Sequence, residues 1–319
     1  MKNLITSLFV FCLCQVAYAA SFDCNKAASK SEKQICSTPE LSKLDEELAS
    51  IFDSAKNQLS PESQKLFTNG QRAWLKFHSS YCFFDQSAKP ADKASSRECQ
   101  IQEYKSRIKS IQQTGTLVYD LKIFPYFQGA FHANPKAEWR NISYDRREVF
   151  LLDGSSPLAT TLNAIIKPRA AVETGNTEST NETNLMLEQW NPDLILIKET
   201  YDASGGAHPV SGTNFNYYSK SFKRMVKIGD VFNSPQWKEL AKKTAKQHFK
   251  KQGIETADDI EIYAESKDAF AYPVSPSGFF IDGFLSYAER AIDGVDMSWK
   301  AFGKYLTPMG QELARGKVR

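Results

Sequence analysis

The sequence predicts two domains: an N-terminal all-α helical bundle held by disulfide bonds, and a C-terminal α+β domain with a mixed or antiparallel sheet. Three observations lead to this prediction. Every cysteine beyond residue 20 lies before residue 100, where helical periodicity dominates. After residue 114, runs of β-branched and aromatic residues replace that periodicity. The length of 319 residues and the hydrophobic content of 41% suit two globular domains better than one.

The first 19 residues have the form of a secretory signal peptide. Met1-Lys2 is a short basic start, residues 4–16 are mostly apolar, and Ala17-Tyr18-Ala19 has the small-x-small pattern of a cleavage site. We therefore expect cleavage after Ala19 and export to a bacterial periplasm. The apolar run is shorter than the roughly 20 residues that a transmembrane helix needs, and no later segment qualifies, so we expect no membrane span.

Four cysteines remain after the leader, an even number that predicts two disulfides in an oxidising compartment. They are Cys24, Cys36, Cys82 and Cys99. Residues 29–32, Ser-Lys-Ser-Glu, form a capping box, so the first helix starts late and the preceding residues can fold back along it. Of the three possible pairings we favour Cys24–Cys36 and Cys82–Cys99. No pair of cysteines has close metal-ligand spacing, and we predict no metal site.

Periodicity and caps predict the helices of this first part. Ser60-Pro61-Glu62 opens a helix whose apolar residues recur every three or four positions: Leu66, Phe67, Gly70, Trp74 and Phe77. We interpret Trp74 as a core anchor. A second capping box over residues 37–40 opens an earlier helix, and a polar loop over residues 85–96 precedes a last helix that ends near Ile111.

Several stretches of this helical part carry a family resemblance. They are Glu32–Cys36, Pro39–Asp45, Gln71–Leu75 and the positions Cys82, Cys99, Tyr104 and Arg107. With them, residues 22–112 resemble the N-terminal domain of the LprI lysozyme-inhibitor family. The resemblance implies a periplasmic module that in some members inhibits lysozyme-type muramidases, and it implies no enzymatic activity. We place this domain at residues 20–113.

Residues 114–319 are predicted to form the α+β domain. The predicted strands are residues 117–124, 148–152, 194–197, 214–222, 269–274 and 278–284, and the predicted helices are residues 235–251 and 296–305. Residues 167–184 are polar and nearly free of large apolar side chains, so we expect a mobile loop there.

A glycine-rich turn is the candidate binding site. It reads Gly205-Gly206-Ala207-His208-Pro209, and it is followed by residues 227–232 and 274–281 in an order that resembles the C-terminal domain of the lysozyme-sensing anti-sigma factor RsiV. The resemblance implies that this domain binds lysozyme. The glycines permit unusual dihedral angles, and Pro209 keeps His208 extended. The predicted binding residues are Ser204, Gly205, Gly206 and His208. His208 either bonds nearby backbone as a turn residue or contacts a partner.

Charge is balanced in total but segregated along the chain. Loss of Lys2 leaves 39 basic against 37 acidic residues, a net +2 that excludes a nucleic-acid footprint. Residues 217–251 carry ten basic and two acidic residues, whereas residues 253–296 carry ten acidic and two basic residues. Either the two segments neutralise each other in the fold, or the acidic one steers a basic partner.

We therefore predict an exported periplasmic protein that binds and inhibits a lysozyme-type muramidase, either a host lysozyme or the toxin of a rival bacterium. The alternative is a module that binds peptidoglycan fragments without inhibiting. A third hypothesis is a hydrolase or deacetylase with an unrecognised site. No catalytic motif is present, so the prediction is no enzyme, no cofactor and no nucleic-acid partner.

Overall fold

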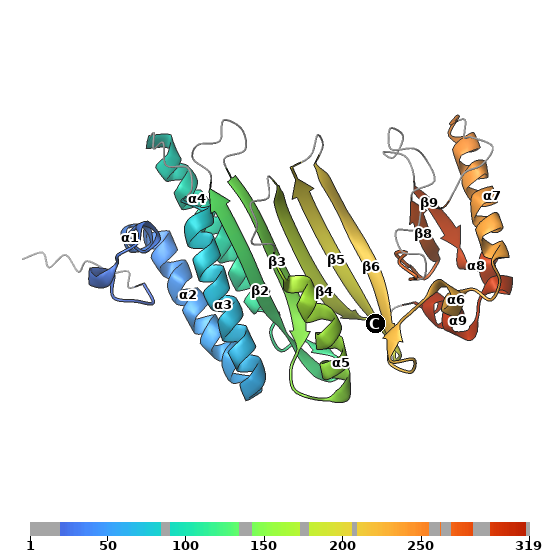
Figure 1. Cartoon of the computed structure of the whole chain (residues 1–319), viewed down its shortest axis with the longest axis horizontal. Helices are drawn as coiled ribbons and strands as arrows, with labels where there is room; N and C mark the ends of the chain where they lie inside the picture. Colours follow the sequence, from blue (N-terminus) through green and yellow to red (C-terminus); the bar gives the residue numbers. More distant parts are fainter. Residues whose placement is uncertain are drawn as a thin grey trace, which may run out of the picture.

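The computed structural model describes residues 20–83, 90–133, 142–172, 179–205, 209–254, 262, 269–282 and 294–316. Its N-terminal part is helical, and its C-terminal part combines a seven-stranded sheet, a two-stranded sheet and further helices (Figure 1). The predicted fold class, a disulfide-stapled helical domain followed by an α+β domain, is confirmed.

The first domain consists of one 3-10 turn and four α-helices. They are η1 (Cys24–Lys26), α1 (Lys30–Ser37), α2 (Pro39–Asn57), α3 (Pro61–Tyr81) and α4 (Pro90–Ile111). The predicted box at Ser29 forms, since its hydroxyl accepts from the Glu32 backbone N–H. The second predicted box does not form, because Ser37 still belongs to α1 and the Thr38 side chain makes no capping bond. The predicted polar loop is wrong from residue 90 onward, where α4 begins.

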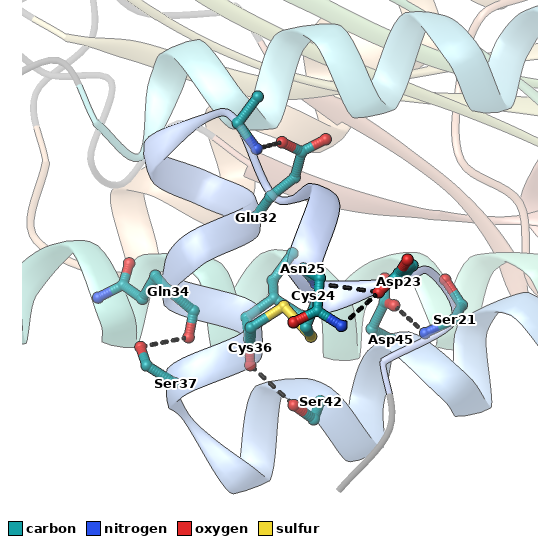
Figure 2. The surroundings of a disulfide bond; sticks show 12 residues. Ser21, Asp23, Cys24, Asn25, Glu32, Gln34, Cys36, Ser37, Ser42 and Asp45 are labelled. Atoms are coloured by element: carbon teal, nitrogen blue, oxygen red, sulfur yellow. Dashed lines mark hydrogen bonds between the residues drawn. A yellow bond between two sulfur atoms is a disulfide. The ribbon is translucent and has the colours of Figure 1, made fainter.

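Both predicted disulfides are present. Cys24–Cys36 ties η1 to α1, so the chain folds back along the first helix (Figure 2). In the same region the Ser42 hydroxyl of α2 donates to the Ile35 carbonyl at 2.8 Å. Cys82–Cys99 joins the end of α3 to α4. Each bridge closes a short loop and, in the chain-entropy model, contributes about 3 kcal/mol.

The large sheet follows the chain order from β1 to β7. Its strands are β1 (Leu117–Val118), β2 (Leu121–Ala133), β3 (Ile142–Leu152), β4 (Thr180–Gln189), β5 (Leu194–Ser204), β6 (Val210–Ser219) and β7 (Arg224–Met225). All neighbours are antiparallel except β3 and β4, so the sheet is mixed. The parallel step is made possible by the crossover through α5 (Pro157–Ile166) and η2 (Lys167–Ala170).

Two sequence-based expectations for this region are wrong. The predicted strand over residues 117–124 is two strands, because Tyr119 and Asp120 turn the chain with φ of 50° and 62°. The predicted mobile loop over residues 167–184 contains η2 at one end and the first part of β4 at the other, while residues 173–178 lie outside the described residues. Polar residues build the first half of β4, Thr180 to Asn184, so the polar composition that predicts a loop is here that of a strand.

The remaining elements form a smaller layer beside β6. They are α6 (Ile228–Val231), α7 (Gln236–Lys251), β8 (Gly278–Asp282), β9 (Gly294–Ser298), α8 (Trp299–Phe302), η4 (Gly303–Tyr305) and α9 (Pro308–Ala314). Helix α7 was predicted within one residue. The strand predicted over residues 269–274 is wrong, since among the described residues only isolated bridges at Ala269 and Val274 occur there.

Two hydrophobic cores meet at the sheet. The first is continuous from the helices into the sheet and includes Trp74 and Tyr104 together with Phe124 and Val149. Alternate residues of β5 serve different cores: Ile195 and Ile197 belong to the first, and Leu194 and Leu196 to the second. The second core also holds Trp237 and Phe279, so it fixes the smaller layer to the sheet. None of the described helices is both long enough and apolar enough to span a bilayer.

Candidate functional site

The predicted binding turn lies between β5 and β6 at one end of the large sheet. Strand β5 ends at Ser204, and Gly205 follows with φ of 156°, in a region that side chains rarely permit. Gly206 and His208 lie outside the described residues, and the chain is described again from Pro209. Ser204 and Gly205 are therefore the members of the predicted site that the structure places.

Ser204 lines a hollow of about 370 Å³ at this end of the sheet. Strands β3 to β6 each contribute to its lining: Tyr144, Thr180, Glu182, Asp202, Ala203, Ser204, Pro209, Val210 and Ser211. We call this the tip hollow. Because strands β4 and β5 are paired there, Glu182 lies directly opposite Asp202, and Ser211 of β6 lies opposite Asp202 on the other side.

The two opposed carboxylates make the tip hollow acidic. The Glu182 carboxylate accepts the Tyr144 hydroxyl at 3.0 Å. Burial, reinforced by the Glu182 charge, raises the pKa of Tyr144 above its ordinary value, so the phenol keeps its proton and donates. Asp202 is exposed, and no side chain of the described residues forms a hydrogen bond or ion pair with it. Like charges directly opposite each other across two strands are unfavourable. On the β3 side Glu182 is the register partner of Arg146, so Asp202 is the carboxylate of this pair that no described cation accompanies.

The rim of the hollow adds hydroxyls and apolar side chains, among them Val210. The Thr180 and Ser204 hydroxyls lie 2.5 Å apart, and Val210 is 49% exposed. This arrangement can accept a guanidinium or ammonium group, with the hydroxyls bonding its N–H groups and Val210 covering its aliphatic stem. Across the described ranges, no three potential metal ligands gather at one point.

Two of the residues that carry the LprI resemblance, Gln71 of α3 and Arg107 of α4, lie elsewhere, where these helices meet the sheet. Arg107 is 2% exposed; its Nε donates to the Gln71 side chain at 2.9 Å, and its Nη1 donates to Glu148 of β3 at 2.6 Å. A second pair, Arg146 with Glu103, lies alongside. These residues join the helical domain to the sheet. Sequence reasoning missed the role of Glu148, which was identified only as part of a strand.

Trp74 is the core anchor that the sequence indicated, since it is 1% exposed. Its ring contacts Tyr104 edge-on, with ring centroids 5.3 Å apart. The Tyr104 hydroxyl in turn donates to Asp45 at 2.9 Å, and Asp45 also accepts the Ser21 backbone N–H. The chain near the expected cleavage site is thereby tied to the centre of the helical domain.

The segregated charge is placed only in part. The basic residues 217–251 lie within the described residues, and the lysines of α7 lie off the stripe that packs into the second core, Trp237, Ala241, Ala245 and Phe249. Most of the acidic segment 253–296 lies outside the described residues. Whether the two segments neutralise each other therefore stays a prediction.

Comparisons with known proteins give three kinds of result. No curated protein matches the chain. Among solved structures, a DUF3298 family protein from Bacteroides fragilis NCTC 9343 is 12% identical with a TM-score of 0.43, covering 63% of this chain and 98% of its own. A DUF3298 family protein from Pseudomonas aeruginosa PAO1 is 11% identical with a TM-score of 0.38, covering 61% and 97%. In the helical domain, residues 24–111 match the family of the lysozyme inhibitor LprI.

Proposed function

We propose that this chain is an exported protein that binds a lysozyme-type muramidase and inhibits it. The observation that carries the proposal is the match of residues 24–111 to the family of the lysozyme inhibitor LprI. Both disulfides lie within these residues. Disulfides persist in oxidising compartments, where cell-wall hydrolases also act, and so they support export. The target is a host lysozyme or a muramidase delivered by a competing bacterium.

The tip hollow is the surface that we assign to the target. Its opposed carboxylates, Glu182 and Asp202, suit an arginine or lysine of a basic muramidase, and the exposed Asp202 is free of partners among the described residues. Electrostatic complementarity of this kind raises the association rate and selects basic partners. The residues of the LprI resemblance support the hollow indirectly, because Arg107 and Gln71 hold the helices against β3.

The test uses the oxidised chain from residue 20 onward and a panel of purified muramidases. We expect the chain to slow the lysis of cell-wall suspensions by at least one of them and to co-elute with it in size-exclusion chromatography. Absence of both effects across the panel would refute the proposal. Sedimentation with insoluble peptidoglycan is the companion measurement, because a module for cell-wall fragments pellets with the polymer and an inhibitor need not.

A further inference from the structure

The turn between β6 and β7 exposes an aromatic ring among basic side chains. Phe222 is 44% exposed, and its neighbours Ser221, Lys223 and Arg224 are exposed as well. Lys223 has φ of 53°, a left-handed conformation that turns the chain back toward β7. We call residues 220–224, with the nearby Lys227, the cationic turn.

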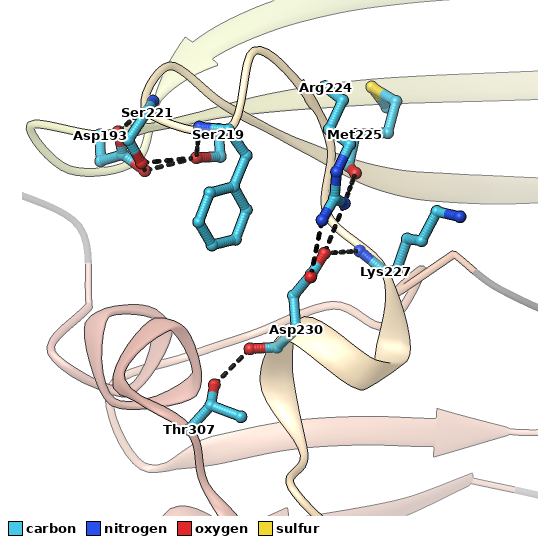
Figure 3. A network of polar contacts seen from close by, with 9 residues as sticks. Asp193, Ser219, Ser221, Arg224, Met225, Lys227, Asp230 and Thr307 are labelled. Carbon is cyan, nitrogen blue, oxygen red and sulfur yellow. Dashed lines mark hydrogen bonds and ion pairs between the residues drawn. The ribbon is translucent and has the colours of Figure 1, made fainter.

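Asp193 fixes the conformation of this turn. Its carboxylate accepts the Ser219 hydroxyl at 2.7 Å, the Ser221 backbone N–H at 2.8 Å and the Ser221 hydroxyl at 3.0 Å (Figure 3). The Phe222 backbone N–H donates to the Ser219 hydroxyl at 3.1 Å. The ring of Phe222 is therefore presented by ordered backbone, and little conformational entropy remains to be lost when it binds.

A second brace comes from the β1–β2 turn. The Lys220 ammonium lies 3.6 Å from the centre of the Tyr119 ring, and the Tyr119 hydroxyl donates to the Leu194 carbonyl at 2.7 Å. Three turns of the sheet are thus joined at this end of the molecule. The cationic turn is thus held by ordered contacts at its base, while the side chains of Phe222 and Lys223 remain exposed.

The charges at the surface are positive, and the nearby carboxylates are engaged. Arg224 pairs with Asp230 through two bonds of 2.6 and 2.8 Å, and its guanidinium lies 5.1 Å from the Phe222 ring centre. Asp230 also accepts the Lys227 backbone N–H. Among the described residues, Lys223 forms no ion pair. An exposed phenyl ring flanked by lysines fits an anionic and partly apolar surface.

We propose that the cationic turn docks on an anionic phospholipid surface. Phe222 enters the boundary between headgroups and acyl chains, because its ring has no polar group to keep it in water. Lys223 and Lys227 contact lipid phosphates, each strengthening binding about fivefold. The binding is peripheral and reversible, and it is independent of muramidase inhibition, since the turn and the tip hollow lie at opposite ends of β6.

The test measures co-sedimentation of the oxidised chain with vesicles of phosphatidylglycerol and phosphatidylcholine in equal parts. Phe222→Ala should weaken binding about tenfold, as expected for a buried aromatic side chain. Lys223→Asn should weaken it about fivefold, and asparagine tolerates the left-handed conformation, so the fold is kept. The matched controls are Leu75→Ala, which removes an exposed apolar side chain from α3, and Lys238→Gln, which removes a lysine from α7.

Three results together support the proposal. The chain should not bind vesicles of pure phosphatidylcholine, and salt should weaken its binding to the mixed vesicles. The two turn variants should also bind less, whereas the two controls should bind like the unmodified chain. Absence of binding to the mixed vesicles overturns it, and so does an equal loss with turn and control variants. If the turn variants release the chain from insoluble cell wall while vesicle binding is unchanged, the surface recognises a glycan, and the lipid assignment is wrong.

Discussion

The indole ring of Trp74 lies flat on the imidazole ring of His78, with ring centroids 4.4 Å apart and planes 7° from parallel. His78 is 2% exposed, and its Nδ1 lies 3.1 Å from the Leu75 carbonyl, which fixes the tautomer that donates from Nδ1. Its Nε2 has no hydrogen-bond partner among the described residues. A proton added at Nε2 would therefore be buried without an acceptor, and burial lowers the pKa of His78 to about 4.

This burial predicts a loss of stability in acid. The pKa of His78 is about 4 in the folded chain and 6.5 in the unfolded chain, so between these values the unfolded state binds a proton that the folded state does not. The free energy of unfolding should thus fall by about 3 kcal/mol as the pH drops through this window. Denaturant unfolding measured at about pH 7 and about pH 4 tests this. His78→Phe keeps the ring against Trp74 and should flatten the dependence; an unchanged slope would assign it to other groups.

The buried pair of Arg107 and Glu148 predicts a non-additive mutant cycle. Arg107→Met leaves the Glu148 carboxylate poorly compensated and should cost about 3–5 kcal/mol of unfolding free energy. The double variant with Glu148→Leu should be more stable than that single variant, because no lone charge remains. Lys105→Met removes the exposed partner of Glu40 and should cost less than about 1 kcal/mol. If the changes in unfolding free energy of the two single variants simply add up to that of the double variant, Arg107 and Glu148 are not energetically coupled.

Close packing of α3 on β2 predicts that Gly129 tolerates no side chain. A Cβ there would lie 2.6 Å from the Phe77 ring and 2.9 Å from the Phe127 ring. Gly129→Ala should lower the free energy of unfolding by about 1–3 kcal/mol, since the aromatic rings must move. Gly303→Ala is the matched control, because nothing lies within 4 Å of its Cβ position. Equal melting temperatures for the two variants would show that the Phe77 and Phe127 rings can move without lowering the free energy of unfolding.

Charge reversal in the tip hollow predicts slower capture of a basic muramidase. Asp202→Lys should reduce the association rate about tenfold at low salt and much less at high salt, where long-range attraction is screened. Surface plasmon resonance at two ionic strengths measures both effects. Asp53→Lys makes the same charge change on the exposed face of α2. If the two variants bind alike, net charge and not the tip hollow governs the encounter.

Local signals in the sequence were enough to predict helix α3 and the Cys24–Cys36 disulfide of the helical domain. The stripe through Phe67, Trp74 and Phe77 predicted α3, and the cap at Ser29 explained how Cys24 reaches Cys36. The turn between β1 and β2 could not be predicted from the sequence. Its two residues with positive φ, Tyr119 and Asp120, are neither glycine nor asparagine, the residues that most often mark such a turn. The positive φ of Tyr119 is stabilised from a distance, through its bond to Leu194.

The candidate site could be located only coarsely. The glycines at 205 and 206 indicated the turn, but the carboxylates of the tip hollow come from strands whose register no local pattern reveals. Glu182 lies in the polar start of β4, and it meets Asp202 only because β4 and β5 pair in this register. Long-range pairing of this kind also places Arg107 on Glu148, 41 residues further along the chain.

The helices and the sheet share one interior, and this bears on how the protein can be divided. Phe67 contacts Phe124 and Phe77 contacts Phe127 across the junction, with ring centroids 6.2 and 5.6 Å apart. A fragment that stops near residue 113 would leave one flank of α3 as bare aromatic surface in water. Such a fragment would be expected to self-associate. Assays of the LprI-like segment are therefore meaningful only when the fragment also includes β2 and β3.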